Sequence, residues 1–385
     1  MAQGILLKNW QDWEEYTRTT KDLTNIVAQD INFAKRDVDF SQFEYDNTSF
    51  LKCRLSRQQA AEIIQSGGFI YPKFSNLPYN PNRSTLYTHV ELLEGFSAEK
   101  DNSVDLKIYK SFIKNKYNPP IHEAMAQRLH DFNIDEALRR LLDVRNDGSS
   151  KKKVVGFMGG HSARRGSKYY VKTAICAKLM AEAGYYVVSG GGPGIMEAAN
   201  LGAYLAGRTH ENLYTAVDHL ANLEFRPEDE GKADYYAKNY VTNAREVLEM
   251  FPNGAENLAI PTWFYGHEPS NVFASHIAKY FSNSIREDTL LAISLYGVVF
   301  APGSAGTTQE IFQEAAQNHY GTFGFISPMI FLSKERYVEE TALYSVLHQL
   351  AKDTIYKELL FLTDEPHEIL EFIREHPPVP VPMPQ

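Results

Sequence analysis

The chain has 385 residues, 43% of them hydrophobic, which is enough for two or three domains with a substantial core and argues against global disorder. Its formal net charge of −9 argues against bulk nucleic-acid binding, although one small basic pocket for a phosphate is compatible with it. The two cysteines, Cys53 and Cys176, have no metal-type spacing and favour a reducing compartment over a disulfide framework.

No stretch of the sequence indicates export or membrane insertion. The segment 1–16 carries acidic residues and no apolar core, so a signal peptide is not expected. The longest apolar run, residues 290–301, is too short to span a bilayer and contains Ser294 and Gly297. We therefore expect a cytoplasmic protein that binds neither membrane nor nucleic acid.

Residues 1–148 are predicted to form an N-terminal accessory domain of α+β type. They lack glycine loops and show no regular alternation of strands and helices. An aromatic or aliphatic residue recurs every fifth position over 40–55, which resembles a pentapeptide-repeat coil, although chance spacing in an aromatic-rich segment explains it equally well. Helices are predicted over 57–65 and 120–142. No chemistry beyond docking or oligomerisation is indicated, and the role of this domain stays open.

The polar segment 146–153 is predicted to be a linker, and strands alternate with helices after it. The alternation predicts an α/β domain over 149–376 with a Rossmann-like, doubly wound parallel sheet. The tail 377–385 contains five prolines and is predicted to be extended and mobile. The predicted strands are 154–158, 185–188, 258–264, 297–301 and 328–332. The predicted helices are 169–183, 195–206, 270–294 (one long helix or a pair), 307–318, 335–351 and 366–375.

Three of the predicted strands run directly into small residues. The segments are Val154–Ser162, Ser189–Ala203 and Val298–Glu310, and a helix follows the glycines in the second and third. A glycine loop at a helix N-terminus presents backbone N–H groups to an anion. Because parallel strands end at one edge of a sheet, the three loops predict one ligand-binding crevice there. Plain glycine-rich turns are the alternative.

Two common nucleotide motifs are absent. The dinucleotide fingerprint G-x-G-x-x-G fails because Ile195 stands where its third glycine would be, counting from Gly190. No phosphate-binding loop of the form G-x-x-x-x-G-K-[S/T] is present. Simple NAD-binding and ATPase interpretations therefore lose most of their support.

The two longer glycine loops resemble those of the LOG family, the cytokinin riboside 5′-monophosphate phosphoribohydrolases often labelled lysine decarboxylases. A GGGxGxMExxxxGA loop stands at 190–203, and a PGGxGTxxE-type loop stands at 302–310. The segments 159–162 (Gly-Gly-His-Ser) and 268–271 (Glu-Pro-Ser-Asn) are more similar to bacterial pyrimidine/purine nucleotide 5′-monophosphate nucleosidases of the same superfamily. The resemblance covers about residues 152–335. One departure is Ser304, which replaces the second glycine of PGG and would be strained if that position required a positive φ.

The resemblance implies a hydrolase that cleaves the N-glycosidic bond of a nucleoside 5′-monophosphate, releasing the free base and ribose 5-phosphate. It implies no cofactor, no metal, and a homo-oligomer of two or more subunits. Arg286 and Glu310 would be the catalytic pair, because a carboxylate stabilises an oxocarbenium-like sugar and an arginine fork suits a phosphate or departing base. No lysine is marked as a pyridoxal-phosphate ligand, so decarboxylation is rejected.

The resemblance also assigns the remaining ligand contacts. The phosphate would be held by Gly190, Gly191, Gly192, Gly303, Ser304, Gly306, Thr307 and Thr308. The ribose and base would be bound by Gly160, Ser162, Met196, Glu197 and Asn271.

Structural alternatives stay open for several of these residues. Glu310 with Thr307 also fits a capping box, Glu197 also fits a helix first turn, and Arg286 also fits a plain surface position. A second functional hypothesis is a non-catalytic nucleotide-binding sensor that uses the same crevice, with the N-terminal domain as its output.

Overall fold

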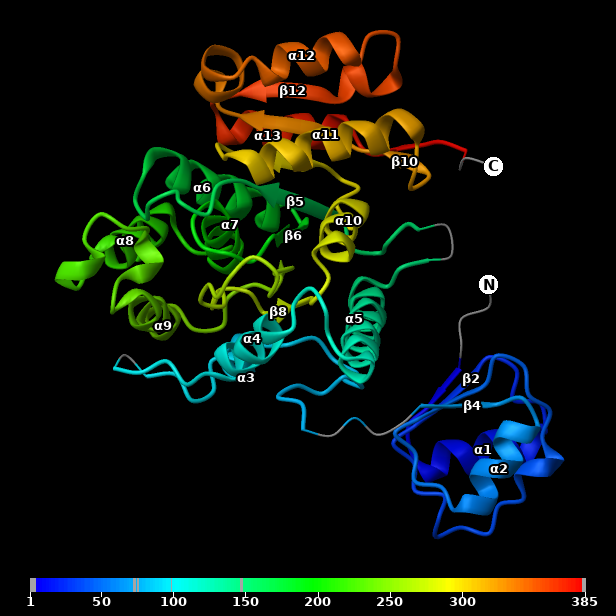
Figure 1. The fold of residues 1–385 in the computed structure, drawn as a ribbon. Helices are drawn as coiled ribbons and strands as arrows, with labels where there is room; N and C mark the ends of the chain where they lie inside the picture. Colours follow the sequence, from blue (N-terminus) through cyan, green and yellow to red (C-terminus); the bar gives the residue numbers. More distant parts are fainter. Residues whose placement is uncertain (1–4, 72–73, 75, 98, 146–147, 383–385) are drawn as a thin grey trace. The chain divides into compact units, whose positions relative to one another are not determined.

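The computed structural model describes residues 5–71, 74, 76–97, 99–145 and 148–382. Its contacts divide the chain into two compact units (Figure 1). The first unit comprises Met1–Asn82 with Ile121–Leu129, and the second comprises Arg83–Pro120 with His130–Gln385. The predicted domain boundaries at 148 and 376 stay predictions. The start of the predicted linker, 146–147, and the end of the predicted tail, 383–385, lie outside the described residues.

The first unit is a stack of short parallel strands with helical connections. The strands are β1 (Ile5–Leu7), β2 (Ile26–Gln29), β3 (Ser49–Leu51) and β4 (Phe69–Tyr71), paired in chain order. The connections contain α1 (Trp10–Thr19), the 3₁₀ helix η1 (Phe40–Gln42) and α2 (Arg57–Gln65), the last as predicted.

The period of this unit is longer than the five residues suggested by the sequence. Val27 pairs with Ser49, and the Asn47 amide donates to the Asn25 side chain at 2.9 Å, both across an offset of 22 residues. A third pair at the same offset is the ion pair between Lys52 and Asp30, at 2.8 Å. The structure therefore favours chance as the source of the five-residue spacing.

The second unit contains a seven-stranded sheet in which every pairing is parallel, which confirms the predicted α/β, Rossmann-like fold. The strand order is β12-β11-β9-β5-β6-β7-β8. The strands are β5 (Val154–Met158), β6 (Tyr186–Ser189), β7 (Leu258–Ala259), β8 (His276–Ile277), β9 (Val298–Phe300), β11 (Met329–Leu332) and β12 (Leu360–Thr363).

The helices of this unit that precede the sheet are α3 (His89–Leu92), α4 (Val104–Lys114) and α5 (Ile121–Leu142), of which α5 begins in the first unit. The others are α6 (Lys168–Glu182), α7 (Ile195–Tyr204), α8 (His210–Ala221), α9 (Tyr240–Met250), α10 (Asn283–Ile293), α11 (Ala305–Tyr320), α12 (Leu343–Leu350) and α13 (Pro366–Glu375). Helices α6 and α7 lie beside β5 and β6, and α11 and α13 lie beside β12 (Figure 1).

Three predicted elements differ from the structure. The region 270–294, predicted as one long helix or a pair, contains strand β8 and then α10, because an apolar run does not distinguish a buried strand from a buried helix. The predicted helix 335–351 is a π-helical turn over Glu335–Glu340 and then α12, interrupted at Ala342 with φ 53°. In the predicted mobile tail, β13 (Val379–Pro380) pairs antiparallel with β10 (Phe325–Ile326).

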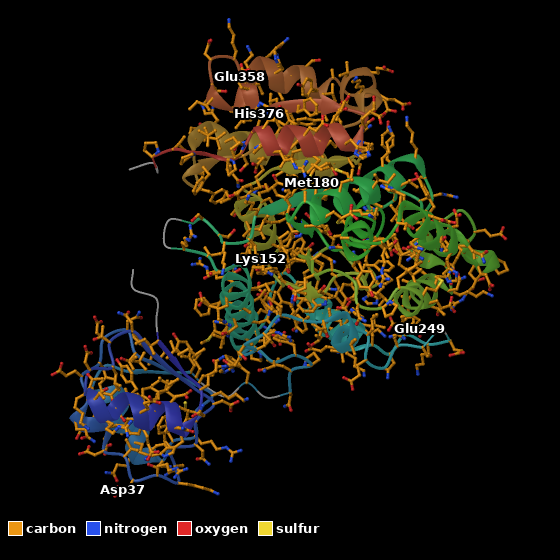
Figure 2. All side chains as sticks on the ribbon, turned by 180° about the vertical axis from the view of Figure 1, so that it is seen from behind. Asp37, Lys152, Met180, Glu249, Glu358 and His376 are labelled. Atoms are coloured by element: carbon orange, nitrogen blue, oxygen red, sulfur yellow. The ribbon has the colours of Figure 1, made fainter. Side chains whose placement is uncertain are left out.

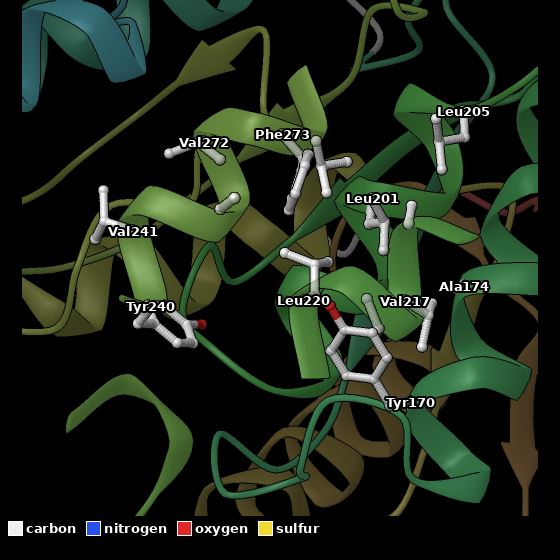
Figure 3. Close-up of a cluster of buried hydrophobic side chains, with 14 of the residues drawn as sticks. Tyr170, Ala174, Leu201, Leu205, Val217, Leu220, Tyr240, Val241, Val272 and Phe273 are labelled. Atoms are coloured by element: carbon white, nitrogen blue, oxygen red, sulfur yellow. The ribbon is translucent and has the colours of Figure 1, made fainter. Parts of the chain in front are cut away.

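A hydrophobic core packs α6, α7, α8 and α9 together. Its side chains include Val241 and the neighbouring Tyr170, Leu201 and Leu220, the last three of which lie close together in Figure 3. Helices α6 and α7 approach so closely that a Cβ atom on Gly202 would lie 2.0 Å from the Ala174 carbonyl oxygen. This packing fixes α7, and with it the glycine loop that precedes it.

A second core lies between the sheet and its helices. Met180 on α6 belongs to it and is fully buried, whereas Glu249 on α9 lies on the surface (Figure 2).

Among the described residues, none of the helices is both long enough and apolar enough to cross a membrane.

Candidate binding site at the switch point of the sheet

The strand order reverses between β5 and β9. From β5 the chain builds one side of the sheet with β6, β7 and β8, and from β9 it builds the other side with β11 and β12. At such a reversal the loops that leave the two central strands diverge, and open α/β sheets bind their ligands there. We call the loops that follow β5, β6 and β9, together with Arg286, Glu310 and Glu268, the switch-point site.

The loops after β5 and β9 touch through their backbones. The Gly160 N–H donates to the Pro302 carbonyl oxygen at 3.0 Å. A Cβ atom on Gly303 would lie 2.0 Å from Oγ1 of Thr307 and 3.0 Å from the Gly160 nitrogen. Gly194 has a φ of +67°, and a Cβ atom on it would lie 2.5 Å from the Gly160 carbonyl oxygen. Only glycine fits this junction without a shift of the backbone.

The loop after β6 lies beneath larger side chains. Gly191 has a φ of +74°, which favours glycine. A Cβ atom on Gly190 would lie 2.3 Å from the Arg286 guanidinium, and one on Gly192 would lie 2.9 Å from Oε2 of Glu268. The same Cβ position on Gly190 would lie 2.7 Å from the sulfur of Met196, and that on Gly192 would lie 2.7 Å from the methyl carbon of Met196. The loop therefore brings its bare backbone next to one cation and one carboxylate.

Arg286 is anchored at the edge of the sheet, so the structure excludes a plain surface position for it. Its Nε donates to the Ile260 carbonyl oxygen at 2.7 Å, and one terminal nitrogen donates to the Gly190 carbonyl oxygen at 3.2 Å. Its other terminal nitrogen lies 3.6 Å from Oε1 of Glu310. The structure thus brings together the two residues predicted as a catalytic pair, whose chemical role stays a prediction.

Glu310 is not the capping residue of its helix. Helix α11 begins at Ala305 after the N-cap residue Ser304, so Glu310 lies in its second turn, beyond the reach of a capping box. Burial raises the pKa of the Glu310 carboxyl to about 7, while Arg286 lowers it and Glu287 raises it. Burial therefore makes the neutral form of this carboxyl easier to reach than in an exposed glutamate.

The first turn of α11 opens toward the site. Ser304 has a φ of −112°, so no positive φ is required there and the expected strain does not arise. Thr307 is buried, and the Thr308 hydroxyl donates to the Ser304 carbonyl oxygen at 3.1 Å. A Cβ atom on Gly306 would meet nothing within 4 Å. The first N–H groups of a helix have no partner within it, so they are available to an anion.

The structure engages two of the predicted ribose- or base-binding side chains internally. Arg165 donates to both Glu197 oxygens, at 2.8 and 2.6 Å, and the Tyr170 hydroxyl donates to one of them at 2.9 Å. The Asn271 amide donates to the Asn200 side chain at 2.8 Å. Both residues are buried, so they support the glycine loop after β6 and offer little to a ligand. Ser162, in contrast, is exposed beside Gly160.

Glu268 is the group that the sequence reasoning missed. Its carboxylate lies against Gly192, and within the described part of the chain it forms neither a hydrogen bond nor an ion pair. Burial raises the pKa of this carboxyl, whereas the nearby charges of His161, Lys279 and Arg286 lower it. The sequence feature that points to Glu268 is its place in the segment 268–271, of which the resemblance assigns only Asn271 to the ligand.

A further buried carboxyl, Glu314, lies one turn after Glu310 on α11. It is 3% exposed, and burial alone raises its pKa to about 8. Because the folded chain holds this proton more tightly than the unfolded chain, with its ordinary value of 4.5, folding stability falls as pH rises between the two values. At pH 9 the free energy of unfolding of Glu314→Gln should therefore exceed that of the unaltered chain. This difference should be larger than the one at pH 5 by roughly 2–4 kcal/mol.

Urea unfolding at pH 5, 7 and 9 measures this difference. Glu211→Gln, an exposed position on α8, is the control and should keep the original pH dependence. Parallel curves for Glu314→Gln and the unaltered chain would show that Glu314 is ionised in the folded state.

The described ranges contain no group of three or more His, Cys, Asp or Glu side chains placed to hold a metal ion. The second unit also contains a groove of about 500 Å³ between α6, α8 and α13. Its lysines, Lys168 and Lys172, are accompanied by Glu365, and it lies apart from the glycine loops.

Comparisons with known proteins identify no family. No family model matches the chain, and no curated protein matches it. One similar solved structure is titled as the molybdenum cofactor binding protein from the phototrophic bacterium Rippkaea orientalis; it is 14% identical, with a TM-score of 0.36 over 59% of this chain and 98% of that one. Another is titled as the Moco carrier protein from Chlamydomonas reinhardtii, 13% identical, with a TM-score of 0.35 over 58% of this chain and 97% of that one.

These findings correct the predicted identity. Membership of the LOG family is wrong, because neither a family model nor a curated protein supports it and the similar structures are titled as molybdenum cofactor proteins. The predicted N-glycosidase activity and the nucleoside 5′-monophosphate as substrate or sensed ligand fall with it. The physical reason is that the motifs at 190–203 and 302–310 specify glycine loops with a bare backbone, and such loops do not determine which ligand is bound.

Proposed function

We propose that the switch-point site binds a small phosphate monoester. The observation that carries the proposal is the backbone junction of Gly160 with Gly303 at the reversal of strand order, beside the open first turn of α11. A phosphate placed there would accept hydrogen bonds from helix N–H groups and lie near a buried guanidinium.

Two carboxyl groups shape the rest of the ligand. Glu268 and Glu310 flank the glycine loops, and each contacts or approaches Arg286. Because an ionised carboxylate only accepts hydrogen bonds, the organic part of the ligand should carry hydroxyl or amino donors. A phosphorylated polyol combines a phosphate with hydroxyl donors on an organic part, whereas inorganic phosphate has no organic part.

Isothermal titration calorimetry with glycerol 3-phosphate tests the proposal, with glycerol as the matched control. We expect saturable binding of the phosphate ester and none of the alcohol. Equal behaviour of the two compounds would contradict the proposal. The molybdenum cofactor, named in the titles of the similar structures, is a second probe, and binding that competes with glycerol 3-phosphate would narrow the ligand class.

We also propose that the protein is cytoplasmic. This location is supported by the two cysteines, Cys53 and Cys176, which are both free thiols in the structure. An enzymatic role for the pair Arg286 and Glu310 stays a prediction.

A further inference from the structure

The loop after β7 carries Glu268 over the glycine loop and is held by a carboxylate from α4. Asp105 accepts hydrogen bonds from Nε1 of Trp263 at 2.6 Å and from the Ser270 hydroxyl at 2.8 Å. Its two oxygens also lie 2.8 and 2.9 Å from Nζ of Lys279, just after β8. Asp105 therefore holds the loop at Trp263, before Glu268, and at Ser270, after it.

A second carboxylate of the same segment holds the residue next to Glu268. Nε2 of His267 lies 2.9 Å from Oδ2 of Asp101, and the other oxygen of Asp101 accepts the Ser103 N–H at 2.9 Å. The neighbours of Glu268 in the chain are thus fixed by Asp101 before it and by Asp105 after it.

Burial makes the Asp105 contacts strong constraints. Asp105 is 1% exposed, Lys279 is 4% exposed and Trp263 is fully buried. A buried ion whose partner is removed costs several kcal/mol, so an alternative loop position that leaves Asp105 or Lys279 unpaired is disfavoured. The charge of Lys279, placed by Asp105, also acts on Glu268.

We propose that Asp101 and Asp105 are positioning residues for ligand binding at the switch-point site, acting through the carboxylate of Glu268. This inference rests on the proposed function. It assigns a binding role to residues that precede the glycine loops, in a part of the sequence where no such role was expected.

The test compares affinities for glycerol 3-phosphate, by calorimetry, among variants of the full chain. Asp101→Asn removes the negative charge that faces His267, and Ser270→Ala removes one hydrogen bond of the loop; both leave the buried pair of Asp105 with Lys279 in place. We expect each to weaken binding about fivefold or more. Asp218→Asn, an exposed position on α8, is the matched control and should bind like the unaltered chain.

The decisive comparison uses Glu268→Gln as a background. If the two aspartates act through Glu268, Asp101→Asn should change the affinity of Glu268→Gln less than about twofold, because effects that share one route are not additive. Asp105→Asn alters the buried ion pair, so its effect on the loop is measured by hydrogen exchange. We expect faster exchange of the backbone amides over 260–275, also where the variant is less stable as a whole.

Two results would overturn the inference while the proposed function stands. One is binding by Asp101→Asn and Ser270→Ala equal to that of the unaltered chain, and the other is full additivity of Asp101→Asn with Glu268→Gln. Failure of the proposed function is distinct, because then the unaltered chain itself does not bind glycerol 3-phosphate, and the inference falls with it.

Discussion

Arg286→Ala is expected to lower the affinity for a phosphate ester about a hundredfold, equivalent to roughly 2.7 kcal/mol, and to destabilise the fold. The lost guanidinium donates to two backbone carbonyls, of Ile260 and Gly190, and both would be left without that donor. It is also the cation nearest to Glu310, whose carboxyl would then remain buried without a partner. Calorimetry and urea unfolding measure the two effects.

Arg208→Ala is the matched control for this substitution. Arg208 also donates to a backbone carbonyl, that of Pro252 at 2.8 Å, but it is exposed and lies outside the switch-point site. It should leave affinity and stability nearly unchanged. Arg286→Lys keeps a charge but loses the fork geometry, so an intermediate affinity is expected. Unchanged binding by Arg286→Ala would remove Arg286 from the site.

Gly303→Ala is expected to disrupt the junction of the two central loops. The added methyl group would lie 2.0 Å from Oγ1 of Thr307 and 3.0 Å from the Gly160 nitrogen, and the backbone neighbour cannot move without breaking the contact to Pro302. We expect a loss of roughly 1–3 kcal/mol in the free energy of unfolding, as for other overpacked sites, together with loss of ligand binding.

Gly306→Ala separates folding from binding. It adds the same methyl group where nothing lies within 4 Å, in the first turn of α11, so stability should be unchanged or rise by up to about 1 kcal/mol. If a phosphate ester occupies the open first turn, the methyl group should still weaken binding. Thermal unfolding and calorimetry on both variants give the comparison, and equal stability of the two would contradict the tight junction at Gly303.

Much of the second unit could be predicted because its strands are short, apolar and separated by glycines. The loops after β5, β6 and β9 were placed correctly at one edge, since parallel strands must end together. Strand β8 was mistaken for a helix, because an apolar run carries no period that separates the two.

The site was predicted only where its chemistry lies in local motifs. Arg286 and Glu310 lie 3.6 Å apart, and their catalytic role stays a prediction. The ion pair of Glu197 with Arg165 and the contacts of Asp105 join segments distant in the sequence, so no local pattern announces them. The glycine motifs predicted where the bare-backbone loops lie but not the ligand, because a glycine carries no side chain that could select one.

Glycine-selective ¹⁵N labelling tests the proposed site most directly. The chain has 24 glycines, few enough to resolve, and they include Gly191, Gly303 and Gly306 at the site and Gly207 away from it. Titration with glycerol 3-phosphate should shift the amide signals of the first three with one common saturation curve and leave Gly207 in place, while glycerol should shift none. Shifts confined to Gly207 and other distant glycines, or none at all, would contradict phosphate-ester binding at the switch point.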